Sequence, residues 1–307
     1  MTETRPLIAA GAILLAMLII GFIDNFVVLI AEDAGLWQFH LTRSAMALPM
    51  IAGLSLLGLG MLRPVRLGAV AARSFLVSIA MVFYFGSLAF LPIAEVAAGL
   101  FTAPIFVLLI TALIQRQTVG PMRALAVVLG FAGVLMVLRP DAGAFSPWAV
   151  VPVLAGLFYA MGAVATRAWC AGESALSLLA GFFLVMAIWG VAGTGLIAMS
   201  GHEAEGFILR GWAPASTSFL WWTFVQAVGS IVAVGLIIKG YQLGETSFVS
   251  AFEYSLLISV SVWAFVLRGE SVDAWAFAGI ATIIASGILI AADARNSGAA
   301  VQRDVVS

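Results

Sequence analysis

Glu253 lies within a long apolar stretch, where an ionisable side chain needs a partner, water or a function. It follows the start of the stretch 246–267 by about eight residues, which corresponds to roughly 12 Å along a helix. A carboxyl group at this depth could line a cavity and bind a substrate amine, or it could exchange a proton. The alternative is a structural acid that accepts hydrogen bonds and holds neighbouring helices together. Both interpretations predict that Glu253 points toward protein and away from lipid.

Asp24 and Arg43 are two further charges at membrane depth. They flank a turn centred near residues 34–35, with Asp24 about ten residues before it and Arg43 about eight after it. In an antiparallel pair of helices these side chains fall at nearly the same depth, so we expect them to form an ion pair. Such a pair would act either as a gate element or as a structural contact.

Neutral polar side chains occur at a similar depth in other apolar stretches. A buried phenol or amide needs a hydrogen-bond partner, so these groups should face the protein interior, either in a substrate cavity or between helices. Thr102 and Pro104 mark a different feature, because proline inside a helix removes a backbone hydrogen bond and produces a hinge or a static bend. The candidates for substrate binding or coupling, besides Glu253, are Tyr254, Tyr84, Tyr159, Gln226 and Asn25.

The amino-acid composition limits the class of protein whose helices or strands could position these side chains. The chain has 307 residues, of which 63% are hydrophobic and 9% are charged, whereas a soluble domain carries roughly 25% charged residues. A soluble enzyme and a disordered chain are therefore excluded. The net charge of −1 provides no basic surface for nucleic acid. With one cysteine and two histidines, the chain is expected to hold no disulfide, no metal and no cofactor.

Ten apolar segments are each long enough to cross the hydrocarbon layer as a helix. Glu95 and Glu245 open two of them, and we expect these acids to cap the helix N-termini. The sequence therefore predicts an all-α integral membrane protein with ten transmembrane helices. The segments are 7–31, 38–60, 72–91, 94–115, 119–138, 147–169, 175–200, 216–239, 246–267 and 272–292.

The ten segments divide into two sets of five near residue 145. The stretch 95–104 weakly resembles the stretch 245–254, which lies 150 residues later. Because five is odd, the second set is inverted relative to the first, and inverted repeats are typical of transporters. We expect one repeat over 1–145, a second over 146–295 and a disordered cytoplasmic tail over 296–307. Lys and Arg in the loops, with Arg73 counted among them, predict that both termini are cytoplasmic.

The stretch 90–106, the run 129–140, Arg43 and the segment from Glu253 to Gly287 follow one another in a specific order and spacing. In these features the chain resembles the drug/metabolite transporter superfamily, in its EamA-type ten-helix branch, over about residues 7–292. The chain departs from the family at two places. Tyr254 follows Glu253 where the family usually has proline, and Gln115-Arg116 stand where it often has Gly-Glu. The resemblance implies export of small metabolites, such as amino acids, across the cell inner membrane.

We therefore expect a monomeric secondary transporter that alternates access to a midplane cavity lined by segments 1, 3, 4, 6, 8 and 9. Protons are candidate coupling ions, and the surrounding partner is the lipid bilayer. The alternative substrates are a nucleotide, vitamin, sugar or drug-like cation. An intramembrane enzyme is the rival class of protein, but the sequence has no Walker A, G-x-S-x-G or H-E-x-x-H motif. We accordingly predict that the protein is not an enzyme.

Overall fold

The computed structural model describes residues 5–87, 91, 93–139, 147–201, 206–269 and 273–306. Every regular element in these ranges is a helix, as expected where hydrocarbon offers no partner to an unpaired backbone group. Nine helical stretches within these ranges are long and apolar enough to cross a membrane. The boundary expected near residue 145 falls outside the described residues, so the division into two repeats stays a prediction.

The first half of the chain contains both continuous and interrupted helices. The first and fourth predicted segments are each broken, at residues 25–26 and at residues 101–102. Its elements are α1 (Pro6–Asp24), α2 (Val27–Asp33), α3 (Leu36–Leu56), α4 (Leu67–Ser87), α5 (Ile93–Leu100), α6 (Ala103–Leu109), the π-helical turn η1 (Ile110–Ile114) and α7 (Pro121–Leu138).

The second half also contains an interrupted segment. A 3₁₀ turn, η4, separates α11 from α12 in the ninth predicted segment. The elements are η3 (Pro147–Ala149), α8 (Val150–Ala168), α9 (Ala175–Ser200), α10 (Thr217–Leu243), α11 (Thr246–Ser250), η4 (Ala251–Tyr254), α12 (Ser255–Arg268) and α13 (Ala274–Val306). The disordered tail expected over 296–307 stays a prediction.

Two predicted segments differ from the structure in an informative way. The second segment forms α3, which is not among the nine apolar stretches and which buries the polar side chains of Gln38, His40 and Arg43. The third segment begins at Leu67 instead of residue 72, so α4 has an additional turn at its start. Arg73 is therefore inside a helix and is 3% exposed, which corrects its assignment to a loop.

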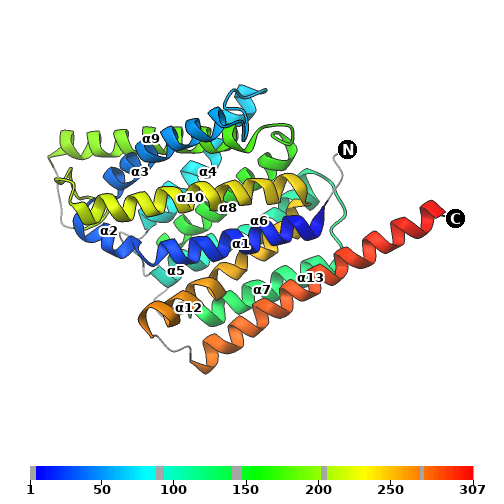
Figure 1. Cartoon of the computed structure of the whole chain (residues 1–307). Helices are drawn as coiled ribbons and strands as arrows, with labels where there is room; N and C mark the ends of the chain where they lie inside the picture. The colour runs from blue at the N-terminus through cyan, green and yellow to red at the C-terminus, as the bar shows by residue number, and fades with distance from the viewer. Residues whose placement is uncertain are drawn as a thin grey trace.

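The helices pack side by side in four main pairs (Figure 1). The pairs are α1 with α10, α4 with α8, α3 with α9, and α7 with α13. In Figure 1 the pair α3–α9 lies at one edge of the bundle and the pair α7–α13 at the opposite edge. Close approach depends on small residues: a Cβ atom on Gly133 would lie 2.7 Å from the Gly279 carbonyl oxygen.

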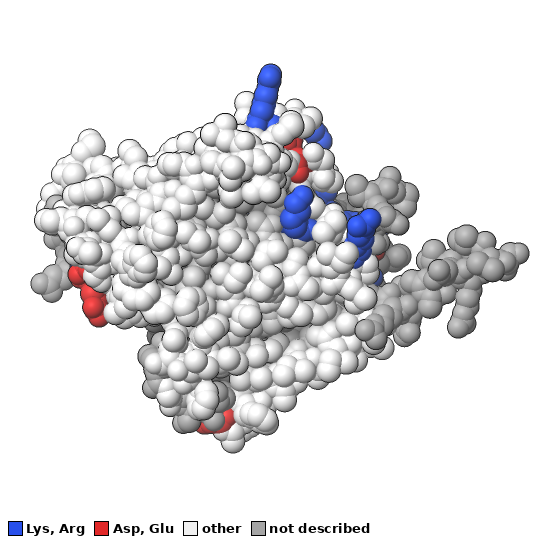
Figure 2. Space-filling model, in the orientation of Figure 1, with Lys and Arg blue, Asp and Glu red and all other residues white. Residues whose placement is uncertain are grey.

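Charged side chains are separated from a wide uncharged band on the surface. On the face drawn in Figure 2, Lys and Arg gather at the end of the bundle where α1 begins, and a broad white region covers the middle. Many exposed side chains in the helices are large and apolar, for example Leu184, Ile188 and Val191 on α9. This arrangement suits helices whose middle sections face lipid.

Candidate functional site

A cavity of about 210 Å³ lies among the helices. All six predicted segments contribute to its lining, through α1, α4, the α5–α6 break, α8, α10 and the η4–α12 junction. The helices α3 and α9 also reach it, each with one side chain, Arg43 and Phe182. Most of the lining is apolar, and the polar groups are concentrated at a few positions. This composition is typical of a small-molecule site.

Glu253 is at the wall of this cavity, held by two phenols. It lies in the 3₁₀ turn η4 and is 6% exposed. Its Oε1 atom accepts hydrogen bonds from Tyr159 Oη over 2.8 Å and from Tyr241 Oη over 2.9 Å. Two hydroxyl donors on one oxygen stabilise the charged carboxylate and leave Oε2 for another partner. The arrangement can accept a proton or a cationic group.

Tyr241 is a residue that sequence reasoning missed. It is 1% exposed and lines the cavity close to the end of α10. The predicted segment 216–239 stops before it, because Lys239 resembles the start of a loop. The structure instead continues α10 to Leu243, which brings the Tyr241 hydroxyl to Glu253. The signal that could have found it is the continued helical spacing of apolar residues beyond Lys239.

Arg73 is the second residue that sequence reasoning did not assign to the site. It lines the cavity from α4, and its Nε atom donates a hydrogen bond to Thr166 Oγ1 over 2.9 Å. The Thr166 hydroxyl in turn donates to the Gly162 carbonyl oxygen over 2.8 Å. One of its terminal nitrogens, Nη1, is buried without a hydrogen-bond partner in the described structure.

Asp24 and Arg43 line the same cavity, but the expected ion pair between them is absent. No carboxylate–guanidinium contact within 4.0 Å joins these two described residues. Arg43 Nη2 instead lies 3.2 Å from His40 Nδ1, and its guanidinium sits 4.8 Å from the centre of the Phe39 ring. Both residues reach one cavity, Asp24 from α1 and Arg43 from α3, without an ion pair between them.

The remaining sequence-predicted residues divide between the cavity and the helix contacts. Gln226, Tyr84, Tyr159 and Pro104 line the cavity. Gln226 Nε2 also donates to the Ile23 carbonyl oxygen over 2.7 Å, beside Asp24. Their roles in binding stay predictions.

Tyr254, Asn25 and Thr102 are not in the cavity lining. Tyr254 is fully buried, with its ring 6.1 Å from that of Phe101 and no hydrogen bond to its hydroxyl in the described structure. Asn25 Nδ2 donates to the Gly21 carbonyl oxygen over 2.6 Å. Thr102 Oγ1 donates to the Gly99 carbonyl oxygen over 2.6 Å, just before α6 begins.

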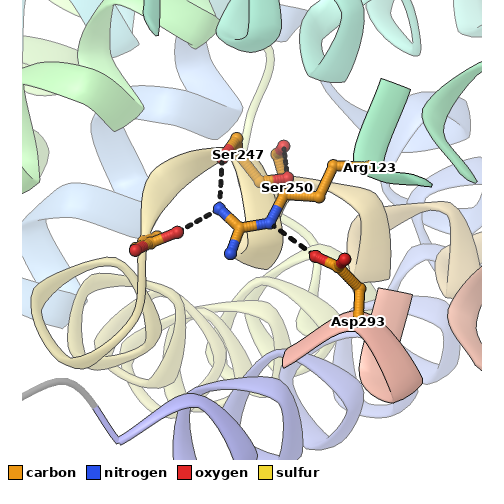
Figure 3. Close-up of polar contacts among 5 residues, drawn as sticks. Arg123, Ser247, Ser250 and Asp293 are labelled. Carbon is orange, nitrogen blue, oxygen red and sulfur yellow. Dashed lines mark hydrogen bonds and ion pairs between the residues drawn. The ribbon is translucent and has the colours of Figure 1, made fainter. Parts of the chain in front are cut away.

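A cluster of charges joins three helices at the end of the bundle where α1 begins. Arg123 of α7 pairs with Asp293 of α13 over 3.2 Å and with Glu245, and it donates to Ser247 Oγ over 3.4 Å (Figure 3). Glu245 is at the N-cap position of α11, but its side chain makes no cap hydrogen bond. The predicted capping role of this carboxylate is therefore wrong, because the carboxylate pairs with Arg123. Glu95 does lie in the first turn of α5.

Metal-binding groups do not gather in the part of the chain that the structure describes. No three His, Cys, Asp or Glu side chains there are placed as a metal site would require. The polar side chains that line the cavity are carboxylates, guanidinium groups, phenols, hydroxyls and an amide.

Comparisons with known proteins give several relatives, although no family model matches the chain. A protein of Brucella anthropi named "Riboflavin transporter" is 22% identical over 214 residues, which cover 66% of this chain and 69% of that protein. A "Riboflavin transporter" of Vibrio cholerae is 27% identical over 198 residues, 64% of this chain and 62% of that protein. An "S-adenosylmethionine uptake transporter" of Rickettsia prowazekii is 21% identical over 199 residues, 65% of this chain and 63% of that protein.

A solved crystal structure shares the fold. Its TM-score is 0.74 at 17% sequence identity, and the match covers 92% of this chain and 98% of the solved one. The nine apolar helices support a multi-pass membrane protein. The named relatives support a transporter and point away from an enzyme. The expectation of amino-acid export finds no support in these names. The vitamin and nucleotide classes, stated as alternatives, agree with them.

Proposed function

We propose that this protein is a secondary transporter of a small heteroaromatic metabolite of the vitamin or nucleoside type. The observation that carries the proposal is the cavity, in which four charged side chains, Glu253, Arg73, Asp24 and Arg43, line a largely apolar space. Charged groups in membrane-spanning helices are costly, and they mark solute pathways when they face a shared cavity. The names of the relatives favour a heteroaromatic solute over an amino acid.

The transport cycle that we propose depends on ten crossing helices arranged as an inverted repeat of five and five. Polar α3 is the tenth, shielded by its pairing with α9. Exchanging the two halves turns the pair α1–α10 into the pair α8–α4 and leaves the pairs α3–α9 and α7–α13 unchanged. This symmetry of the packing supports the duplication, because two equivalent halves allow rocking around a fixed site.

In this proposal Glu253 is the substrate-binding or coupling acid, assisted by Tyr159, Gln226 and Tyr84. Asp24 and Arg43 approach each other when one side of the cavity closes. The break at Thr102 and Pro104 acts as the hinge of the first half, and η4 takes the matching position in the second half. Asn25 and Tyr254 act at the edges of these moving parts.

Orientation in the cell inner membrane is part of the same proposal. The end of the bundle that carries Lys and Arg, which is also the end where α1 starts, faces the cytoplasm (Figures 1 and 2). In this proposal the protein works as a monomer, because helices from both halves of one chain line the cavity. Proton coupling through Glu253 is the proposed source of energy.

The experiment that tests the function is uptake of labelled riboflavin and labelled S-adenosylmethionine by bacterial cells that express the chain. Cells with an empty vector provide the baseline, and cells expressing Glu253→Gln provide the matched inactive variant. Saturable uptake or release of either solute above both controls supports the proposal. Equal rates in all three strains, with the protein present in the membrane, contradict it for these solutes.

A further inference from the structure

Arg73 differs from the other charged side chains of the cavity in how little compensates its charge. It lies six residues after the start of α4, about 9 Å along the helix, and it is 3% exposed. Its one hydrogen bond to a described residue goes to the neutral hydroxyl of Thr166, and Nη1 has no partner there. The side chains of Tyr159 and Cys170 interact electrostatically with Arg73, and both are neutral in their ordinary states.

The other charged side chains of the cavity have more polar or charged neighbours than Arg73 has. Glu253 accepts two phenol hydrogen bonds, and Asp24 lies beside the Gln226 amide and shares its part of the cavity with Arg43. Arg43 also contacts His40 and the face of the Phe39 ring. A buried guanidinium without an acidic partner is costly unless another anion completes it. No described carboxylate forms an ion pair with Arg73, and Arg73 lines the cavity, where a solute could supply the anion.

We propose that Arg73 binds an anionic oxygen group, a carboxylate or a phosphate, on the transported molecule. This inference rests on the proposed function of the cavity and adds the chemical class of its substrate. The rest of the molecule lies along Val77, Met81 and Tyr84, which line the cavity from the same face of α4. From Arg73 onward, successive residues of this set are four, four and three positions apart, which places all of them on one face of the helix. The substrate is thus an amphipathic anion with an apolar or aromatic body.

The contact with Thr166 gives Arg73 a fixed orientation for this task. Because Thr166 Oγ1 donates to the Gly162 carbonyl oxygen, its lone pairs are left to accept from Arg73 Nε. The hydrogen bond from Nε to Thr166 fixes the guanidinium plane, and the Nη atoms can donate hydrogen bonds to a ligand. Planar guanidinium groups bind carboxylates and phosphates through paired, charge-assisted hydrogen bonds, which a neutral isostere cannot form. Discrimination between an anion and its neutral counterpart should be about tenfold to a hundredfold.

The test uses matched pairs of compounds that differ in one anionic group: riboflavin 5′-phosphate against riboflavin, and nicotinate against nicotinamide. Binding to the purified full chain is measured by titration calorimetry. For at least one pair we expect the anionic member to bind about tenfold or more tightly than the neutral member. Arg73→Gln removes this preference without weakening the neutral member, and Arg73→Lys retains part of it. Arg63→Gln, which changes an exposed arginine outside the cavity, leaves the preference intact.

Two results would overturn the proposal. One is equal binding, or no binding, of the anionic and neutral members of both pairs by the wild-type chain. The other is a preference that persists in Arg73→Gln. If Arg73→Gln does not fold, the comparison rests on Arg73→Lys and on Thr166→Val, which releases the guanidinium and should also lower the preference. Transport of riboflavin without any anion preference would refute the Arg73 site alone. An Arg73-dependent preference without transport of any solute would refute the proposed function alone.

Discussion

Tyr241 Oη donates a hydrogen bond to Glu253 Oε1 over 2.9 Å and connects α10 to the 3₁₀ turn η4. The same oxygen accepts from Tyr159 Oη over 2.8 Å, which adds α8 to the contact. One carboxylate thus holds together three helical elements around the cavity. A proton or a cationic ligand that reaches Oε2 reduces the negative charge to which both phenols donate, so occupancy of the cavity and the packing of α8 and α10 are coupled.

The two phenols should be coupled energetically through Glu253. Tyr241→Phe removes a hydrogen bond to a charged group, which costs about 1.5 to 3 kcal/mol, and Tyr159→Phe should cost a similar amount. With Glu253→Gln in the background, each Phe substitution should cost less, because a neutral acceptor forms a weaker bond. Thermal unfolding of the single and double variants in detergent measures this coupling. Strict additivity of the three substitutions would contradict a shared acceptor.

Close packing of α7 against α13 should depend on Gly133. A Cβ atom there would lie 2.7 Å from the Gly279 carbonyl oxygen and 2.8 Å from Ile283 Cγ1. Gly133→Ala must therefore separate the two helices, at a cost of about 1 to 3 kcal/mol. Gly195→Ala is the matched control, since its added methyl group meets nothing within 4 Å. A thermal scan should show a lower midpoint for the first variant alone, and equal midpoints would refute this account of the contact.

The charge cluster around Arg123 should be sensitive to charge reversal and to salt. Arg123→Glu places a third acid beside Glu245 and Asp293, so we expect a lower unfolding midpoint. Adding Glu245→Arg to that variant should recover part of the loss, because it restores an opposite pair. The difference between wild type and Arg123→Glu should shrink in about 1 M salt, where charges are screened beyond about 3 Å. A reversal variant as stable as wild type at low salt would show that the cluster contributes nothing.

The pH dependence at the start of α13 should follow Asp273. The backbone N–H of Ala276 and the Arg139 guanidinium hold the pKa of this carboxyl below its usual value of 3.8. Because the folded-state pKa is depressed, its stabilisation is fully present above the unfolded value and is lost as the pH falls through the folded pKa. Wild type should therefore lose stability on acidification below about pH 4 more steeply than Asp273→Asn does. Identical acid profiles of the two proteins would contradict this role.

Hydropathy predicted where the helices lie because transfer into lipid depends on composition alone. The segment 175–200 coincides with α9, which has no buried charge to interrupt it. The prediction for α4 started five residues late, since Arg73 resembles a loop residue when its burial in protein is unknown. The cost of a charge in lipid predicted that Glu253 faces the protein interior, and the structure buries it at the wall of the cavity.

Rotation about a helix axis could not be predicted from a single sequence. Tyr254 and Glu253 are neighbours in the chain, yet Glu253 faces the cavity while Tyr254 packs against Phe101. Asp24 and Arg43 share a cavity without forming an ion pair, because the facing of α1 and α3 is set by packing against other helices. The contact between Tyr241 and Glu253 likewise depends on how the helices are rotated against one another, so only the tertiary structure reveals it.

The measurement that tests the central claim most directly is solute counterflow in liposomes that contain the purified protein. Vesicles are loaded with unlabelled riboflavin, riboflavin 5′-phosphate or S-adenosylmethionine, and entry of the labelled solute is followed. We predict saturable counterflow of at least one of these solutes, an initial rate at least about tenfold lower for Glu253→Gln, and an unchanged rate for Arg63→Gln. Glu253→Gln preserves the acceptor oxygen for both phenols, so a loss of rate would report the charge and not the fold. Absence of counterflow for all three solutes, or full activity of Glu253→Gln, would contradict the account.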